Sequence, residues 1–298
     1  MKQPLFQGCA TALATPFTET GAIHFDVLGQ WIEFQIAGKA DALVVCGTTG
    51  ESATMSERER LSVLEFAVWK TAKRIPVIAG TGTNDTRQSV ELTRSAARLG
   101  ADGALTVCPY YNKPPQEGLL RHFTALADCS DLPVILYDVP SRTGSTLAPE
   151  TRQILAKHPN IAGLKDASGS LAGAAKIRGL CGEDLPLYSG DDGCIVPFLS
   201  LGGKGVISVA SNLLPKVLHD LCAKWFKGDL QGAAEDQLRL MPLINALFKT
   251  SNPIPVKAAM EALGYPPAHY RLPLCPLPEE EKEALLALIQ PWIREADT

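Results

Sequence analysis

One lysine near the middle of the chain has the surroundings that carbonyl chemistry requires. Lys165 follows the short apolar run Ile161–Leu164, and the chain turns polar at Asp166. Such a run is typical of a buried strand, so we expect Lys165 at the carboxyl end of that strand. Burial disfavours the ammonium form, lowers the pKa and leaves a neutral amine that forms Schiff bases with aldehydes and ketones. The alternative is a lysine that ends the strand and extends into water.

Further polar side chains follow other predicted strands. Thr48 and Thr49 stand between two glycines, where a tight turn can present N–H groups and hydroxyls to an anion. Tyr137 ends another strand, where a phenol can relay protons. Arg142 follows it and offers a planar fork suited to a carboxylate. The alternatives are an ordinary turn at the threonines and a surface salt bridge at Arg142.

At two more strand ends the pattern leaves the role open. Tyr110 and Tyr111 stand between prolines, and rigid packing is our interpretation for Tyr110. Asp191 and Asp192 suit either a helix cap or a ligand contact. The five histidines are scattered, and none lies at a predicted strand end beside a partner, so we assign them no catalytic role.

These groups together predict a Schiff base at Lys165. The compound bound there would be a carbonyl compound that carries a carboxylate. Phenol and hydroxyl groups would move the protons. No step requires a metal or an organic cofactor, and we expect neither.

The elements that position these residues alternate along the chain. Strand candidates are Cys9–Thr15, Ala42–Cys46, Val77–Ala79, Gly103–Val107, Val134–Tyr137, Ile161–Leu164, Leu187–Ser189 and Gly205–Val209. Most are apolar throughout, as are strands of a parallel sheet that is covered by helices. Eight strand–helix repeats predict an α/β fold, a (β/α)8 TIM barrel with a C-terminal helical extension. The alternative, a doubly wound open sheet, would have a Gly-rich dinucleotide turn after the first strand, and the sequence has none there.

The helix pattern divides the chain into two parts. Between the strands, amphipathic segments are Phe25–Ala37, Ser56–Thr71, Thr86–Leu99, Gln116–Ala127, Pro149–His158, Leu171–Leu180 and Gly193–Leu201. Ser56–Glu59 has the pattern of a capping box. After residue 212 only helices are predicted, at Pro215–Phe226, Leu230–Phe248, Pro255–Leu263 and Glu279–Ile293. We therefore predict a barrel over residues 1–212 and a helical bundle over 213–298, the latter a small second domain or an oligomerisation element.

Composition argues against several classes of protein. Of 298 residues, 46% are hydrophobic and 20% charged, which is typical of a globular protein with a sizeable core. A net charge of −4 provides no electrostatic footprint for nucleic acid or anionic membrane. Apolar runs fall short of the roughly 18 residues of a membrane span, and the N-terminus has no signal-peptide pattern. The eight cysteines lack the spacing of zinc or redox sites, so we expect free thiols in a cytoplasmic protein.

The motifs resemble those of the dihydrodipicolinate synthase / N-acetylneuraminate lyase family of class I aldolases, over nearly the whole chain. The resembling segments are Thr15–Phe17, Gly47–Ala53, Ala79–Gly82, Pro109–Pro114, Leu136–Gly144, Gly163–Gly169, Ser189–Asp192, Gly205–Ser208, Asn252–Lys257 and Leu272–Leu274. Arg142 resembles the arginine with which the synthases of the family hold the carboxylate of aspartate semialdehyde. Sialic acid lyases and sugar-acid aldolases generally differ there.

The resemblance implies a lyase of lysine biosynthesis through diaminopimelate. Pyruvate would form a Schiff base with Lys165, and its enamine would attack L-aspartate 4-semialdehyde, followed by cyclisation. The implied proton relay comprises Tyr137, Thr48 and Tyr111, with Tyr111 reaching into the neighbouring subunit's site. The resemblance therefore implies a dimer as the minimum active unit and a homotetramer, a dimer of dimers, as the usual assembly.

The resemblance also implies a pyruvate pocket. Thr49 would hold the pyruvate carboxylate, and Gly190 and Ile207 would line the pocket. One nearby position departs from the family pattern: Asp138 stands where asparagine is common, a change that we expect to be tolerated.

Many synthases of the family bind lysine as a feedback inhibitor at the dimer interface. Four residues match that possible allosteric site, namely Ser52, Ala53, Asn84 and Tyr110. Gln88, however, stands where sensitive enzymes carry a glutamate, and Glu57 and Arg60 stand where they often carry histidines. Without a carboxylate at Gln88 the ammonium group of the inhibitor loses a charge-assisted contact, so we expect weak or absent inhibition by lysine.

Two other functions are alternatives. The first is another pyruvate-dependent aldolase of the same family, acting on a sugar acid or other aldehyde. The second is a non-enzymatic relative that keeps the barrel as a ligand-binding or regulatory protein. The intact set of Lys165, Tyr137, Thr48 and Tyr111 argues against the second, because a binding module has no evident need for a proton relay.

Overall fold

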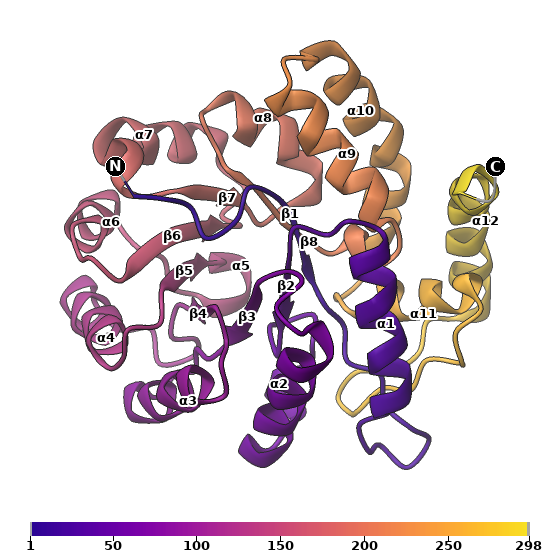
Figure 1. Cartoon of the computed structure of the whole chain (residues 1–298), viewed down its shortest axis with the longest axis horizontal. Coiled ribbons are helices and arrows are strands. Elements are labelled where there is room, and N and C mark those ends of the chain that lie inside the picture. Colours follow the sequence, from indigo (N-terminus) through magenta and orange to yellow (C-terminus); the bar gives the residue numbers. More distant parts are fainter. Residues whose placement is uncertain (1, 297–298) are drawn as a thin grey trace.

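A closed barrel of eight parallel strands forms the centre of the molecule (Figure 1). The computed structural model describes residues 2–296. The strands are β1 (Gly8–Ala12), β2 (Ala42–Val45), β3 (Val77–Gly80), β4 (Gly103–Val107), β5 (Val134–Asp138), β6 (Ile161–Asp166), β7 (Leu187–Ser189) and β8 (Gly205–Ser208). Each strand pairs with the next in the chain, and β8 pairs with β1 to close the sheet. The predicted TIM barrel is confirmed.

Helices surround the barrel. They are α1 (Phe25–Ala37), α2 (Glu57–Thr71), α3 (Thr86–Arg98), α4 (Gln116–Asp128), α5 (Pro140–Thr143), α6 (Pro149–Ala156), α7 (Leu171–Cys181), α8 (Ile195–Ser200), α9 (Pro215–Phe226), α10 (Leu230–Leu247), α11 (Ile254–Met260) and α12 (Glu279–Ala296). Single 3-10 turns occur at Ser52–Thr54, Gly182–Asp184, Asp192–Cys194, Ala210–Asn212 and Glu261–Leu263. The single-turn helix α5 was not predicted, because four residues are too few to show a helical period.

Two strand boundaries differ from the prediction in ways that matter for the site. β1 ends at Ala12, before the predicted end at Thr15. β6 continues past Leu164 to Asp166, so Lys165 lies within the strand. The cause is pairing: Tyr137 of β5 is opposite Lys165, and Asp138 is opposite Asp166. Hydrogen bonding to β5 therefore keeps Lys165 and Asp166 within β6, although a prediction from the apolar run alone ends the strand before these polar residues.

The start of α2 shows how local sequence fixes an element. Ser56 Oγ accepts a hydrogen bond from the Glu59 backbone N–H at 3.3 Å, and Glu59 Oε2 accepts one from the Ser56 N–H at 2.9 Å. This reciprocal arrangement is the predicted capping box, and it satisfies donors that the first helical turn leaves free.

The strands bury side chains on both faces. One set fills the barrel interior and includes Ala10, Val44, Ile78, Leu105, Ile135, Tyr188 and Ile207. Their neighbours along the strands, such as Cys9, Leu43, Val77, Ala104, Val134, Leu187 and Val206, belong to a second set packed against the helices. This alternation explains why the strands are apolar throughout, and it leaves space for a ligand only at the ends of the barrel.

The C-terminal helices share the outer core with the barrel. Leu218 of α9, Leu243 of α10, Val256 of α11 and Ile289 of α12 are buried in the same hydrophobic cluster as the barrel helices. In Figure 1 α9 and α10 follow α8 around the barrel, whereas α11 and α12 lie on the side of α1. The division of the chain at residue 212 into a barrel and a separate bundle stays a prediction.

Two further expectations concern the whole chain. The eight cysteines are all unpaired thiols, as predicted. Within residues 2–296, no helix has the length and apolar character that crossing a membrane requires.

Candidate active site

A cavity of about 620 Å³ lies at the carboxyl ends of the strands. Six predicted site residues line it: Thr48, Thr49, Tyr137, Arg142, Lys165 and Gly190. Residues of the C-terminal part complete the wall: Met241, Ile244, Asn245, Phe248, Thr250 and Asn252. Barrel closure therefore brings together strand ends that are far apart in the sequence, and the C-terminal segment covers one side of them.

Lys165 is buried at this cavity, with 6% of its surface exposed. Its Nζ lies 4.4 Å from the centroid of the Tyr137 ring, and it forms no hydrogen bond or ion pair with the described residues. Burial lowers the pKa of Lys165 to about 8; the Asp192 carboxylate opposes this shift and the Arg142 guanidinium adds to it. About a tenth of the amine is then neutral at pH 7, which is enough for a nucleophile that attacks carbonyl carbon.

Tyr137 and Thr48 form a hydrogen-bonded pair beside this amine. Burial raises the pKa of Tyr137, while the Arg142 charge and the hydrogen bond with Thr48 act in the opposite direction. The phenol therefore stays protonated at neutral pH. A protonated phenol linked to a hydroxyl can pass a proton to or from a group bound at Lys165.

Gly190 leaves the space next to Lys165 open. A Cβ at this position would lie 2.7 Å from Ala167 Cβ and 3.1 Å from Lys165 Cε, so any side chain would press on the lysine. Ile207, by contrast, is buried in the barrel interior and does not line the cavity.

Tyr111 lies apart from the other predicted relay residues. Its side chain is 87% exposed and does not line the cavity. Its backbone has a φ of 72°, in the left-handed region, and its N–H donates to the Thr143 carbonyl at 3.3 Å. Within one chain, therefore, Tyr111 is a surface aromatic, and its place in the relay stays a prediction.

Asn252 is a site residue that the sequence analysis missed. Its Nδ2 donates to Thr49 Oγ1 at 2.9 Å, and its backbone carbonyl accepts a hydrogen bond from Arg142 Nη2 at 3.3 Å. This buried residue thus holds both residues that were predicted to bind carboxylates. The sequence showed Asn252 at a break between helices and at the start of a segment that resembles the family, and neither feature indicates a contact with a residue 203 positions away.

A buried ion pair fixes the same C-terminal segment to the loop after β2. Lys257 Nζ lies 2.5 Å from Glu51 Oε1 and donates to the His269 carbonyl at 2.7 Å. Both side chains are 1% exposed, and Lys257 also faces the rings of Phe17 and Tyr270. Lys257 is therefore a buried lysine with its charge paired, unlike Lys165.

A second cavity, of about 220 Å³, adjoins the first. Three of the possible allosteric residues line it, namely Ser52, Ala53 and Tyr110, together with Arg60. The buried Arg60 donates from Nη2 to the Gly80 carbonyl at 2.8 Å, but its Nε has no hydrogen-bond partner in the described part of the chain. Asn84 and Gln88 do not line this cavity, and Gln88 is exposed on α3.

Comparison with known proteins assigns the chain to a family. Residues 5–291 match the model of the dihydrodipicolinate synthetase family. The chain belongs to this family. The resemblance that the sequence motifs indicated is therefore confirmed.

Individual members of the family align over nearly the full length. The 4-hydroxy-tetrahydrodipicolinate synthase of Geobacter sulfurreducens is 47% identical, over 97% of this chain and 99% of its own. The crystal structure of dihydrodipicolinate synthase from Aquifex aeolicus superposes with a TM-score of 0.94 at 42% identity, covering 97% of this chain and 98% of that one. The crystal structure of the chloride-inhibited dihydrodipicolinate synthase from Acinetobacter baumannii, in complex with pyruvate, superposes with a TM-score of 0.93 at 42% identity. The match covers 95% of this chain and 98% of that one.

The lowered pKa of Lys165 leads to a labelling prediction. Competitive labelling with acetic anhydride across pH 6 to 11, followed by peptide mapping, should show Lys165 reacting with a midpoint near pH 8, because only the neutral amine is acylated. A free lysine derivative added as an internal reference should react with a midpoint about two pH units higher. Lys257 is the buried control and should stay unlabelled in the folded protein. A midpoint for Lys165 at the value of the reference compound would contradict its desolvation.

Proposed function

We propose that this protein is a 4-hydroxy-tetrahydrodipicolinate synthase, which condenses pyruvate with L-aspartate 4-semialdehyde. The observation that carries the proposal is the buried, unpaired Lys165 amine in the same cavity as the Arg142 guanidinium. The amine suits a keto acid, and the guanidinium suits the carboxylate of a second substrate. Membership of the dihydrodipicolinate synthetase family supports it. The free thiols support a cytoplasmic location.

In the proposed reaction, the neutral Lys165 amine attacks the keto carbon of pyruvate. Loss of water gives an imine, and loss of a methyl proton gives the enamine. Thr49, held by Asn252, would bind the pyruvate carboxylate, and the open space at Gly190 would admit the methyl carbon. The hydrogen-bonded pair of Tyr137 and Thr48 would carry protons to and from these intermediates.

The second half of the proposed reaction joins the two substrates. The enamine carbon attacks the aldehyde carbon of the semialdehyde, and the aldehyde oxygen takes a proton to become a hydroxyl. The semialdehyde amine then attacks the imine carbon and displaces Lys165, which closes the ring and frees the enzyme. Arg142, held by the carbonyl of Asn252, would orient the semialdehyde through its carboxylate.

A homodimer is the proposed minimum unit of activity, within a homotetramer. Tyr111 supports this part of the proposal, since a tyrosine with 87% of its surface exposed on a backbone of positive φ is poorly explained by packing within one chain. In the dimer it would enter the partner's site and extend the relay of Tyr137 and Thr48.

The Arg142→Ala substitution should affect the semialdehyde and leave the reaction with pyruvate largely unchanged. At pH 8.5, where Lys165 is largely neutral, we expect kcat/KM for the semialdehyde to fall at least about tenfold, because a charge-assisted contact to its carboxylate is lost. Borohydride trapping of pyruvate on Lys165, read by intact mass and peptide mapping, should change little. Arg121→Ala is the control, since that arginine is exposed and forms its ion pair with Glu117, on its own helix.

The same assays test the proposed function itself. Wild-type protein that forms no pyruvate adduct at Lys165 would exclude the aldolase class. An adduct accompanied by turnover of a sugar-acid aldehyde, and none of aspartate semialdehyde, would favour the alternative aldolase. An Arg142→Ala protein with unchanged semialdehyde kinetics would contradict the role of the guanidinium.

Subunit mixing tests the shared site. We expect Lys165→Met and Tyr111→Phe each to lower kcat by about 100-fold or more, because each removes a group that reacts or transfers a proton. Co-expressed with two affinity tags and purified on both, the mixed dimers should recover up to about half of the wild-type activity, because one site in each dimer is then wild type. Mixed dimers no more active than the parents would show that Tyr111 acts within its own chain or not at all.

Regulation by lysine is proposed to be weak or absent. Arg60 places a cation in the cavity that Ser52, Ala53 and Tyr110 line, and none of the acidic residues within 2–296 lines it. The ammonium group of lysine would meet a like charge there, and like charges at a contact cost binding free energy.

Lysine titration of the purified enzyme checks this proposal. We expect about 1 mM lysine to leave the rate unchanged, and Arg60→Gln to increase sensitivity by removing the repelling cation. Lys73→Gln, which alters an exposed lysine, should have no effect on lysine sensitivity. Half-inhibition of the wild-type enzyme well below 1 mM would overturn the proposal.

A further inference from the structure

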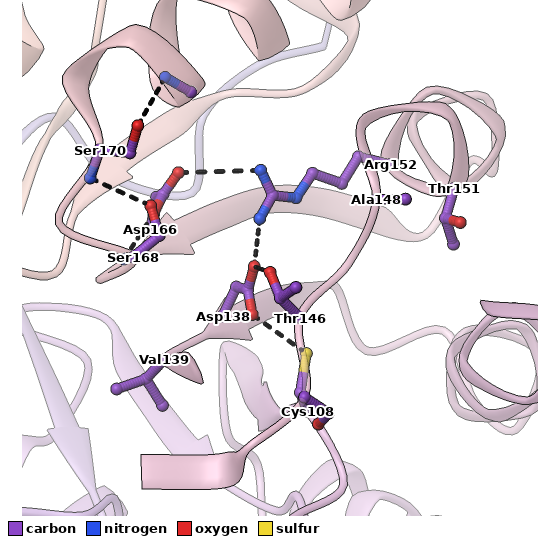
Figure 2. A network of polar contacts seen from close by, with 12 residues as sticks. Cys108, Asp138, Val139, Thr146, Ala148, Thr151, Arg152, Asp166, Ser168 and Ser170 are labelled. Atoms are coloured by element: carbon purple, nitrogen blue, oxygen red, sulfur yellow. Dashed lines mark hydrogen bonds and ion pairs between the residues drawn. The ribbon is translucent and has the colours of Figure 1, made fainter. Parts of the chain in front are cut away.

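A buried cluster of charges lies directly behind the two strands that carry Tyr137 and Lys165 (Figure 2). Arg152 of α6 forms an ion pair with Asp138 through Nη2, and its Nη1 lies 3.9 Å from Asp166 Oδ2. The exposed fractions are 5% for Arg152, 0% for Asp138 and 1% for Asp166. One guanidinium therefore faces two carboxylates in a place that water does not reach.

The register of β5 and β6 explains how these residues relate to the cavity. Tyr137 is opposite Lys165, and the next residues, Asp138 and Asp166, are opposite each other. Successive side chains on a strand point to opposite faces. Tyr137 and Lys165 line the cavity, so the two aspartates point outward, where Arg152 of α6 reaches them.

Asp138 and Asp166 depend on Arg152 to different degrees. Asp138 has other partners, because Thr146 Oγ1 donates to its Oδ2 at 2.7 Å and the Cys108 thiol to its Oδ1 at 3.6 Å. Asp166 Oδ1 accepts a hydrogen bond from the Ser168 N–H at 2.8 Å, but among the described residues its Oδ2 has no hydrogen-bond partner. The ion pair with Arg152 is then what compensates the charge at that oxygen.

Backbone hydrogen bonds connect the same residues to the cavity. The Asp138 carbonyl accepts from the Ala167 N–H at 2.9 Å, and the Asp166 carbonyl accepts from the Gly190 N–H at 2.8 Å. Ala167 and Gly190 both line the cavity. A displacement of either aspartate would therefore move the lysine, the phenol and the open space at Gly190 together.

We propose that Arg152 is a positioning residue of the active site, which joins Asp138 and Asp166 behind the barrel and thereby fixes Tyr137 relative to Lys165. This inference rests on the proposed roles of Tyr137 and Lys165. Arg152 touches no substrate. It acts by holding the ends of β5 and β6 in register and by neutralising negative charge close to the reacting groups.

If the charge of Arg152 matters for its positioning role, its removal should shift the pH profile, which a loss of packing alone would not do. The Asp138 carboxylate already raises the pKa of Tyr137, so the charges of the cluster act electrostatically on a residue that lines the cavity. Without Arg152, two carboxylates would be unpaired behind the site. Added negative charge favours the ammonium form of Lys165, so the acid limb of the pH profile should move to higher pH. The other charges that act on Lys165, those of Asp192 and Arg142, stay in place.

The experiment compares Arg152→Met, Asp138→Asn and the double variant in the full chain. Arg152→Met keeps the length of the side chain and removes its charge. We expect its kcat to fall at least about tenfold, with KM for pyruvate changed less than about threefold, because the relay geometry is disturbed while the carboxylate site remains. In the pH profile of kcat/KM for pyruvate, the midpoint of the acid limb should shift to higher pH by about half a unit. The double variant has one carboxylate fewer, so it should regain most of the lost kcat, and its pH profile should return most of the way to that of the wild type.

Arg178→Met is the matched control. Arg178 is an arginine on the adjacent helix α7 that forms an ion pair with Glu183 and a hydrogen bond with the Gly182 carbonyl, away from the two strand ends. We expect this variant to lose some thermal stability and to keep the wild-type kcat and pH profile.

The outcomes separate this inference from the proposed function. Wild-type protein must first form the pyruvate adduct at Lys165; if it does not, the proposed function fails. If it does, an Arg152→Met protein with wild-type kcat and pH profile overturns the positioning role. A loss of kcat with an unmoved pH profile and no recovery in the double variant also overturns it, in favour of a structural role. If Arg152→Met does not fold, Arg152→Gln, which also removes the charge and keeps a polar side chain, is measured against the same criteria.

Discussion

Removal of the Lys165 amine from water is the constraint on which the rest of the site depends. A pKa lowered from 10.5 to about 8 corresponds to about 3 kcal/mol lost by the charged form relative to the neutral form. The closed barrel makes this possible, because its interior is filled with side chains and the C-terminal segment covers one side of the cavity at its end. The same enclosure raises the pKa of Tyr137 and keeps its phenol protonated. Burial thus prepares a nucleophile and a proton donor in one cavity.

The cavity also needs polar groups that are held in place, and here the C-terminal segment takes part. Asn252 holds Thr49 and Arg142, while the ion pair of Lys257 with Glu51 attaches the same segment to the loop after β2. The Lys257–Glu51 pair is buried, so salt screens it less than a surface ion pair. The helices after the barrel are therefore part of the site wall as well as of the outer core.

The strand ends serve two purposes because side chains alternate between faces. On β5 and β6, one residue faces the cavity and the next faces the helices. The outward aspartates meet Arg152, which explains how Asp138 is accommodated at a fully buried position. The cost of burying this cluster is offset only when its charges are paired. On each strand, the residue that faces the cavity is thus followed directly by the aspartate that contacts Arg152.

The barrel, the lysine and six of the residues that line the cavity could be predicted from the sequence. Strand and helix periods are local properties, and parallel strands in a barrel place their carboxyl ends together, so the sequence pattern alone predicts that Lys165, Tyr137 and Arg142 share one site. Other features could be seen only in the folded chain. Among the described residues Lys165 has no ion pair whereas Lys257 has one, Asn252 reaches Thr49, and Ile207 is buried in the barrel interior. The physical reason is that a side chain's partner and its burial depend on contacts between segments that are distant in the chain, which no local pattern contains.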